Sequence, residues 1–422
     1  MRILWITNNL LPDICEHLHM PEVTKTGWLH SAANQIKSEV KLSVAALYAG
    51  HELKQISLNG INYILVPALK DKRIYDNSLS VYWKTIKKTV NPDVVHIHGT
   101  EYPAGLGYIE SCGANGVVIS IQGLISEIAK YYNFGLDNLE ILEYISLRDI
   151  LKRETLWRQA RSFQVRGKYE CEYLRKGINF IGRTNWDKAH IKTFNPDANY
   201  YFNNETLRNS FYESEWSLEK AEKHTIFFSQ ATYPMKGLHI LIKAIPIVLR
   251  KFPDTLIRVA GFDLTKASHS ALAGRLRATT YGNYLHSLLC KYDVEKNIQF
   301  TGNLSETEMC DMYLKSHVYV NASALENSSN SIGEAQLLGV PVVASFVGGT
   351  DSIVTNNESG LLYPADDVTR LADCIIRIFE DDTLALRLSE NGRLQARDRH
   401  DKTKNKDRLL EIYRDISSQF SS

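Results

Sequence analysis

The sequence lacks several features that would place the protein in a class at once. Its six cysteines are scattered without a C-x-x-C pair, so neither a zinc site nor a disulfide framework is indicated. No apolar run approaches the ~20 residues of a membrane span, and the opening MRILWITNNLLPDI has too short an apolar stretch for a secretion signal. A formal net charge of +1 gives no overall attraction to nucleic acid. These absences favour a cytoplasmic globular protein without a nucleic-acid partner.

Apolar runs of strand length alternate with helix-length segments in both halves of the 422-residue chain, which is long enough for two domains. This rhythm is typical of βαβ units with buried parallel strands. The expected class is therefore α/β, with two doubly wound, Rossmann-like domains. We predict helices at 28–39, 103–112 and 138–176, and strands at 3–7, 42–47, 94–99, 117–123, 179–182, 224–230, 255–261, 297–302, 317–323 and 341–345.

The domain boundaries are predicted from where this rhythm stops. Residues 206–223 are polar and carry no strand signal, so we expect a linker there, between a first domain at 1–205 and a second at 224–400. Residues 401–422 include a helical stretch whose apolar side chains share one face and require a surface to pack on.

The stretch ENSSNSIGEAQLLGVPVVAS at 326–345 sets two glutamates, Glu326 and Glu334, around the expected start of a helix. Open α/β sheets bind ligands at the carboxyl ends of their strands, so the cleft between two such domains is the expected site. A helix start offers free N–H groups that suit a diphosphate, and Glu334 is expected in its first turn. Alternatively, Ser331 and Glu334 form only a capping box. The residues expected at the helix start are Asn330, Ser331 and Ile332.

Two further segments place polar side chains after predicted strands. In FFSQATYPMKGLHILIKAI, Lys236 precedes a helix, where its ammonium could meet an anion, although a lysine in that position is commonly just solvated. In DVVHIHGTEYPAG, alternation puts His96 and His98 on one face of a strand, with His98 nearest the carboxyl end. His98 could hydrogen-bond a substrate hydroxyl, or it could be structural.

These motifs together resemble family 4 glycosyltransferases, which are retaining enzymes of the GT-B fold, and the resemblance covers most of the chain. It implies that Glu334 holds the ribose of a nucleotide sugar and Glu326 the donor sugar. It also implies that Lys236 binds the donor diphosphate and that His98 reaches the cleft from the first domain. Glu326, His98 and Lys236 are thus the implied catalytic residues, and the helix at 402–419 is implied to cross back to the first domain.

The chain departs from the family pattern at two places. The family commonly carries an arginine six residues before the lysine, where this chain has Gln230, which can donate a hydrogen bond but no charge. Arg183 could substitute for that arginine from the first domain, or it could pair with Asp187 one turn away. In place of the family's Gly-Gly loop after the first strand stands Lys25-Thr26-Gly27, where Gly27 still lets backbone approach a ligand.

The implied activity is transfer of a sugar from a nucleoside-diphosphate sugar, with UDP expected rather than GDP, to a hydroxyl of a saccharide or glycolipid acceptor. The sequence contains no D-x-D, so we expect neither a metal nor a further cofactor. The resemblance suggests a part in assembling bacterial surface polysaccharide. A sugar-nucleotide epimerase and a non-catalytic sugar-binding protein remain alternatives. A nicotinamide dehydrogenase is excluded, because no G-x-G-x-x-G follows a strand, and a glycosidase pair requires a carboxylate separation that the sequence does not give.

Residues 146–176 are basic and interleaved with apolar and aromatic side chains. Such a segment could rest on anionic lipid near a lipid-linked acceptor, which would place the protein peripherally at the inner membrane face. The alternative is a set of helices packed on the first sheet with a solvated basic face.

Overall fold

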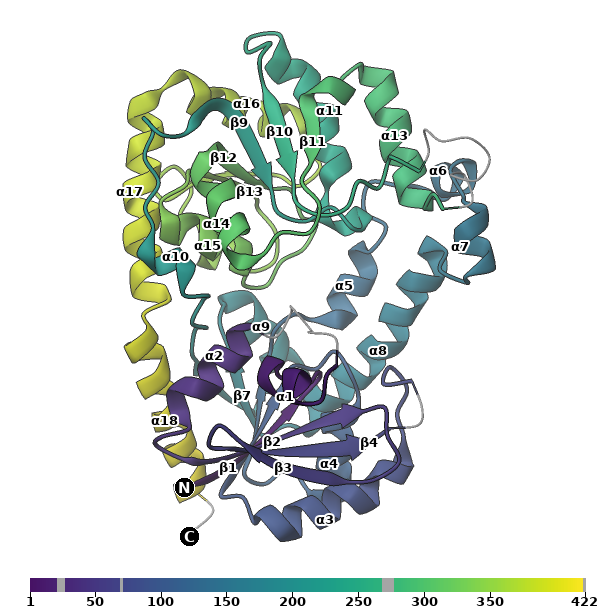
Figure 1. The fold of residues 1–422 in the computed structure, drawn as a ribbon, viewed down its shortest axis with the longest axis vertical. Helices are drawn as coiled ribbons and strands as arrows, with labels where there is room; N and C mark the ends of the chain where they lie inside the picture. The colour runs from purple at the N-terminus through teal and green to yellow at the C-terminus, as the bar shows by residue number, and fades with distance from the viewer. Residues whose placement is uncertain (21–26, 69–70, 268–276, 420–422) are drawn as a thin grey trace. The chain divides into compact units, whose positions relative to one another are not determined.

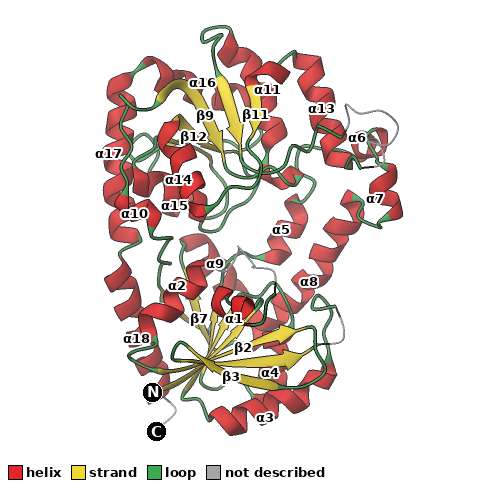
Figure 2. Cartoon of the chain, in the orientation of Figure 1, coloured by secondary structure: helices red, strands yellow, loops and turns green. Residues whose placement is uncertain are grey.

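The computed structural model describes residues 1–20, 27–68, 71–267 and 277–419, which form two compact units (Figure 1). Unit 1 contains Met1–Glu127, Phe163–Arg208 and His400–Ser422, and unit 2 contains Ile128–Ser162 and Asn209–Arg399. Each unit has its own β-sheet with helices packed on it, as Figure 2 shows by colour. Neither unit is one continuous stretch of the chain.

Two segments lie elsewhere than the predicted boundaries would put them. Residues 128–162, predicted as part of the first domain, belong to unit 2. The predicted linker at 206–223 is divided between the units after Arg208, and its second part is folded. There the indole of buried Trp216 donates to the carbonyl of Ser316 at 2.8 Å. One buried tryptophan therefore anchors a segment whose polar composition indicated a linker.

The sheet of unit 1 has eight strands in the order β3-β4-β2-β1-β5-β6-β7-β8, and only the β3–β4 pair is antiparallel. The predicted strands are present; β3, β4 and β8 are additional. The strands are β1 (Arg2–Thr7), β2 (Lys41–Tyr48), β3 (Lys54–Leu58), β4 (Ile61–Pro67), β5 (Val94–His98), β6 (Val117–Ser120), β7 (Asn179–Gly182) and β8 (Asn199–Phe202).

Helices cover both faces of this sheet because its strands are apolar on both sides. Ile3 and Trp5 pack with α1, α2 and α18, and the intervening Leu4 packs with α3, α4 and α8. The hydroxyl of Tyr413 on α18 accepts from the indole nitrogen of Trp5 at 2.9 Å, so the last helix completes the core around the first strand. These helices are α1 (Pro12–His17), α2 (Gly27–Ile36), α3 (Ser80–Val90), α4 (Ala104–Cys112), α8 (Leu156–Lys176) and α18 (Lys402–Ser418); α9 (Asn185–Phe194) also belongs to unit 1, and α5 (Ile125–Tyr131) crosses the boundary, as α8 does.

The sheet of unit 2 is entirely parallel, in the order β11-β10-β9-β12-β13-β14. Its strands are β9 (Glu222–Phe228), β10 (Leu256–Val259), β11 (Ile298–Phe300), β12 (Ser316–Asn321), β13 (Val342–Ser345) and β14 (Leu361–Tyr363). The main helices are α11 (Leu238–Leu249), α13 (Thr280–Tyr292), α14 (Glu306–Lys315), α15 (Asn330–Leu338), α16 (Val368–Glu380) and α17 (Asp382–Arg399), and α10 (Ser210–Glu213) is a single turn.

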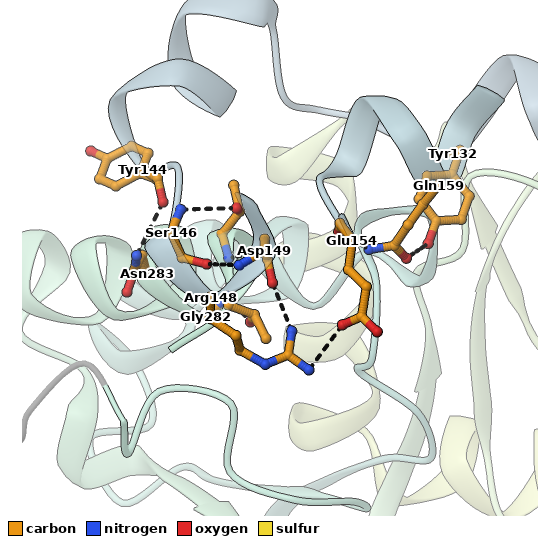
Figure 3. Close-up of polar contacts among 11 residues, drawn as sticks. Tyr132, Tyr144, Ser146, Arg148, Asp149, Glu154, Gln159, Gly282 and Asn283 are labelled. Carbon is orange, nitrogen blue, oxygen red and sulfur yellow. Dashed lines mark hydrogen bonds and ion pairs between the residues drawn. The ribbon is translucent and has the colours of Figure 1, made fainter. Parts of the chain in front are cut away.

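The predicted helix at 138–176 is three helices, because new N-caps interrupt it. Asp137 caps α6 (Asn138–Glu143) and Ser146 caps α7 (Leu147–Leu151), and each accepts from the backbone N–H of the third residue of its helix. Asp149 of α7 accepts from the backbone N–H of Thr280 at the start of α13, at 2.7 Å. Figure 3 shows this packing, with Asn283 of α13 donating to the carbonyl of Tyr144 at 3.1 Å.

In each sheet the first strand along the chain lies in the middle, and the later strands are added on both sides of it. β1 lies between β2 and β5, and β9 lies between β10 and β12. Loops diverge at the carboxyl ends of such strand pairs, and ligands of open α/β sheets bind there. Residues that follow β1 and β5 in unit 1, and β9 and β12 in unit 2, are therefore the first candidates for a site. Within the described ranges, no helix has the length and apolar character needed to cross a bilayer.

Candidate functional site

Lys236 follows β9 and lies at the switch point of unit 2, which is the place where the loops after β9 and β12 diverge. A glycine holds it there. After β9 the chain forms a short 3-10 turn, Pro234–Lys236, and Gly237 follows with a φ of +77°. A Cβ on Gly237 would lie 1.9 Å from the carbonyl oxygen of Ala322 in the loop after β12. Only glycine allows both this conformation and this approach. The loops that follow β9 and β12 therefore pack directly against each other.

This packing brings together Lys236 and Glu326, which the sequence separates by 90 positions. The Lys236 ammonium donates to Oε1 of Glu326 at 2.6 Å, and the hydroxyl of Ser323 donates to the same oxygen at 2.6 Å. The side chains are 16% and 13% exposed. Burial by itself would lower the pKa of Lys236, but the Glu326 carboxylate and neighbouring hydroxyl groups raise it above its ordinary value. The lysine therefore carries its charge at any physiological pH.

The loop carrying Glu326 is fixed through its backbone. The carbonyl of Glu326 accepts from the N–H of Gly349 at 2.9 Å. A Cβ on Gly348, whose φ is +53°, would lie 2.0 Å from that carbonyl oxygen. The Gly348-Gly349 pair thus lets the loop after β13 pass closely beneath Glu326.

Glu334 does not form the capping box that was the alternative to a binding role. Helix α15 begins at Asn330 with Ser329 as its N-cap, and no side chain caps it. Glu334 is therefore the fifth residue of the helix, and its predicted place in the first turn is wrong. Its side chain is 6% exposed.

The three residues predicted at a helix start are indeed the first three of α15. Ile332 is fully buried, so only its backbone could meet a ligand, and the carbonyl of Ser331 accepts from the Tyr313 hydroxyl at 3.1 Å. Gln230, two residues after β9, donates to the hydroxyl of Thr232 at 3.4 Å and brings no charge. The formal cation that the structure places beside Glu326 is thus Lys236.

In unit 1, the rings of His96 and His98 lie on the same face of β5, as predicted, with centroids 3.7 Å apart. His96 is structural: its Nδ1 lies 2.6 Å from the hydroxyl of Tyr413 and its Nε2 lies 2.6 Å from that of Ser120. Burial lowers the pKa of His96 to about 3.

His98, at the carboxyl end of β5, differs from His96. It is 5% exposed and packs edge-on against Trp5, with ring centroids 4.3 Å apart. Neither of its ring nitrogens has a hydrogen-bond partner among the residues that the structure describes. Burial first, and the neighbouring His96 second, lower the pKa of His98 well below its usual range, so the ring is neutral.

Arg183 and Gly27 are the other predicted residues of unit 1. The carboxylate of Asp187 accepts from the Arg183 backbone N–H at 2.9 Å. The guanidinium of Arg183 pairs with Glu205 at 2.7 Å and donates to the carbonyl of Gln122 at 3.1 Å. Its charge is thus neutralised inside unit 1. Gly27 is the first residue of α2, and Lys25 and Thr26 lie outside the described residues.

The structure also shows a polar pair that the sequence reading passed over. Asn8 directly follows β1, and its side-chain amide donates to Oε2 of Glu101 at 2.6 Å, three residues after β5. Burial, and next the charge of Glu170, raise the pKa of Glu101 to about 7 despite hydrogen bonds that favour the carboxylate. Only the positions of the two residues in the sequence could have indicated this pair, since both follow strands that are neighbours at the switch point of the sheet.

Comparison with known proteins identifies the segment that carries the unit 2 site. Residues 212–395, which include Lys236, Glu326 and Glu334, match the family described as glycosyl transferases group 1. A D-inositol 3-phosphate glycosyltransferase of Corynebacterium urealyticum is 28% identical over 182 residues, which are 43% of this chain and 41% of that protein. The chain spans less than half the length of the first curated relatives that it matches.

Two solved structures share the fold over nearly the whole chain. Sucrose-phosphate synthase from Thermosynechococcus elongatus has a TM-score of 0.69 at 15% identity, covering 99% of this chain and 100% of that one. HepE of Anabaena, solved with UDP and glucose, has a TM-score of 0.66 at 16% identity, covering 98% and 99%. The chain therefore has the GT-B fold, with two Rossmann-like α/β units.

Proposed function

We propose that this protein transfers a sugar from a nucleoside-diphosphate sugar, UDP rather than GDP, to a hydroxyl of a saccharide or lipid-linked acceptor, with retention of configuration. The observation that carries the proposal is the buried ion pair of Lys236 and Glu326 at the switch point of unit 2. That pair lies inside the segment that matches group 1 glycosyltransferases. The neighbour from Anabaena, solved with UDP and glucose, supports the choice of UDP.

In this proposal Lys236 stabilises the departing diphosphate, which carries most of the charge that develops in the transition state. The first N–H groups of α15, at Asn330, Ser331 and Ile332, add donors for an anion. Glu334 accepts from the ribose hydroxyls, and Glu326 acts at the donor sugar. Gln230 contributes a hydrogen bond in place of the family's arginine.

Residues of unit 1 act on the substrate hydroxyls. The neutral ring of His98 can donate one hydrogen bond and accept another, and Gly27 at the start of α2 leaves room for backbone to approach a ligand. Arg183, whose guanidinium pairs with Glu205, is a further candidate of unit 1 for contact with the substrate. We further propose membership of the retaining family 4, no metal or other cofactor, and a role in bacterial surface polysaccharide assembly.

We also propose a cytoplasmic location with peripheral contact at the inner membrane face through 146–176. In support, α7 leaves Leu147 and Leu151 61% and 77% exposed, and Lys152 and Arg153 are exposed directly after it. Apolar side chains beside basic ones suit an anionic lipid surface. Failure of the protein to sediment with anionic liposomes at low salt would remove this part of the proposal.

Nucleotide binding tests the central claim. Thermal unfolding of the wild type with UDP, GDP or ADP in chelator should show stabilisation by one nucleotide, amounting to ~2.7 kcal/mol when its concentration is 100 times the Kd. Lys236→Gln should lose this shift. Lys296→Gln, which changes an exposed lysine of the same unit, should retain it. A wild type that no nucleotide stabilises would refute the donor site.

Product analysis separates the transferase from its alternatives. With donor and acceptor, a transferase yields a new glycoside, whereas an epimerase alters the donor without any acceptor. Activity that EDTA abolishes and a divalent ion restores would overturn the metal-independent mechanism.

A further inference from the structure

A cavity of about 60 Å³ lies within unit 1, beside the predicted site residue His98. Its walls come from the carboxyl ends of β5, β6 and β7, from α2 and α18, and from residues 203–206. Trp28 and Ile121 form apolar parts of the wall, and Asn203 and Asn204 form polar parts.

Four polar atoms of three residues around this cavity are buried without a hydrogen-bond partner among the described residues: both ring nitrogens of His98, and the side-chain oxygens of Asn203 and Asn204. His98 is 5% exposed and Asn203 is 9% exposed. A buried donor or acceptor left unpaired destabilises the folded state, so native structures contain few such atoms. Their concentration on one cavity indicates that a ligand completes their hydrogen bonds.

The charges around the cavity limit what this ligand can be. Arg183 pairs with Glu205 at 2.7 Å, and Lys406 pairs with Glu39 at 2.6 Å. Both of these cations, among the described residues that line the cavity, are therefore paired with a carboxylate, and the lining does not favour a phosphate. The neutral His98 ring has one donor and one acceptor, and the two asparagine oxygens are acceptors. A complementary ligand is uncharged and supplies several O–H donors, as a polyol does.

The size of the cavity agrees with this class. By the same measure of volume, one water molecule needs about 10–15 Å³, so a cavity of about 60 Å³ has room for several hydroxyl groups along one edge of a ring. The remainder of the ring would lie outside, where half-buried Trp28 offers an apolar surface. One hydroxyl-bearing edge of a ring therefore fits the inner part.

We propose that this cavity is the subsite for an uncharged, hydroxyl-bearing ring of the acceptor, a sugar or cyclitol residue, and that Asn203 and Asn204 determine its specificity. This assignment rests on the proposed transferase function, which it deepens. Two hydroxyl groups of the ring donate to the asparagine oxygens, and one of them also bonds the His98 ring. An acceptor ring phosphorylated at that edge is disfavoured, because its charge would be buried without a partner.

The proposal predicts opposite effects on stability and on acceptor binding. Asn203→Leu and Asn204→Leu remove unpaired buried acceptors and keep a similar side-chain volume, so the free protein should melt at the same or a higher temperature. The same changes should raise the KM for the acceptor by about tenfold or more each, since a bonded hydroxyl loses its partner. The thermal shift by nucleotide should not change, because both asparagines belong to unit 1 and the proposed nucleotide site to unit 2.

Asn195→Leu is the matched control in unit 1. The side chain of Asn195 donates to the carbonyl of Gly177 at 2.8 Å and does not line the cavity. This variant should lose stability and keep the acceptor KM of the wild type. An acceptor KM within twofold of the wild type for both Asn203→Leu and Asn204→Leu would mean that the cavity holds only water.

Direct binding tests the subsite independently of catalysis. Saturation-transfer NMR of the wild type with glucose, mannose, N-acetylglucosamine and inositol should detect at least one ligand, and the double variant should lose that signal. Absence of binding by the whole panel, or binding that the double variant retains, would overturn the subsite. If nucleotide binding fails while sugar binding depends on Asn203 and Asn204, the transferase function is wrong and the subsite remains.

Discussion

Replacing Glu101 by glutamine should change how the stability of the protein depends on pH. Burial of the Glu101 carboxyl group, followed by the nearby charge of Glu170, raises its pKa from 4.5 to about 7. Hydrogen bonds from the backbone and from Asn8, together with the charge of Arg166, oppose this rise only in part. A carboxyl group whose pKa is higher in the folded protein contributes its full stabilisation of the folded state at any pH below its unfolded pKa. That contribution disappears as the pH rises through the folded value.

The expected magnitude is roughly 3 kcal/mol between pH 4.5 and pH 8, because one pKa unit corresponds to about 1.4 kcal/mol. For a unit of this size, that is roughly 6–12 °C in melting temperature. His96 acts in the opposite direction, since burial lowers its pKa to about 3 and its contribution is lost as the pH falls. The informative quantity is therefore the difference between wild type and Glu101→Gln, in which the histidine contribution cancels.

Melting curves of both proteins from pH 5 to pH 8 provide the measurement. Glu101→Gln should gain on the wild type as the pH rises, because glutamine keeps the hydrogen bond from Asn8 without acquiring a charge. Glu172→Gln, which changes a surface carboxylate paired with Arg175 on α8, should leave the difference flat. Parallel curves for wild type and Glu101→Gln would refute the conclusion that this carboxyl group is protonated in the folded protein near neutral pH.

Three further outcomes are expected. Lys236→Met should reduce transfer by at least about a hundredfold in a steady-state assay, because the leaving diphosphate loses its cation; activity within tenfold of the wild type would contradict this. Gly348→Ala should cost at least ~2 kcal/mol in denaturant unfolding, since its φ is +53° and the new Cβ would lie 2.0 Å from the Glu326 carbonyl oxygen. Tyr413→Phe should cost about 2 kcal/mol by depriving His96 and the Trp5 indole of a buried partner, whereas an unchanged melting temperature would show that another group replaces the hydroxyl.

The strands predicted from the sequence were those whose packing leaves a clear pattern. β1, β5, β12 and the second half of β9 are buried on both faces, and each is rich in apolar residues. Strand β3, KQISL, is mostly exposed and antiparallel at an edge, so its polar residues gave no such signal. The break after α6 had a signal, since Ser146 is a good N-cap, but the basic amphipathic pattern across 146–176 concealed it.

The candidate site could be predicted where a local rule fixes the position of a residue. Lys236 and Glu326 each follow a central strand, so their meeting is a consequence of sheet order. The partner of Arg183 is Glu205, 22 positions away, and no local rule selects it over Asp187. The cavity beside His98 depends on residues from seven separate stretches of the chain, which only the folded protein brings together.

The hydrogen bond between Trp5 and Tyr413 joins residues 408 positions apart. During synthesis, the first strand therefore leaves the ribosome long before the helix that covers one face of its sheet. Unit 2 needs nothing beyond Arg399, so it can finish folding while unit 1 still exposes apolar surface. A premature stop before Lys402 would therefore leave unit 2 complete and the core of unit 1 open on the face that α18 covers.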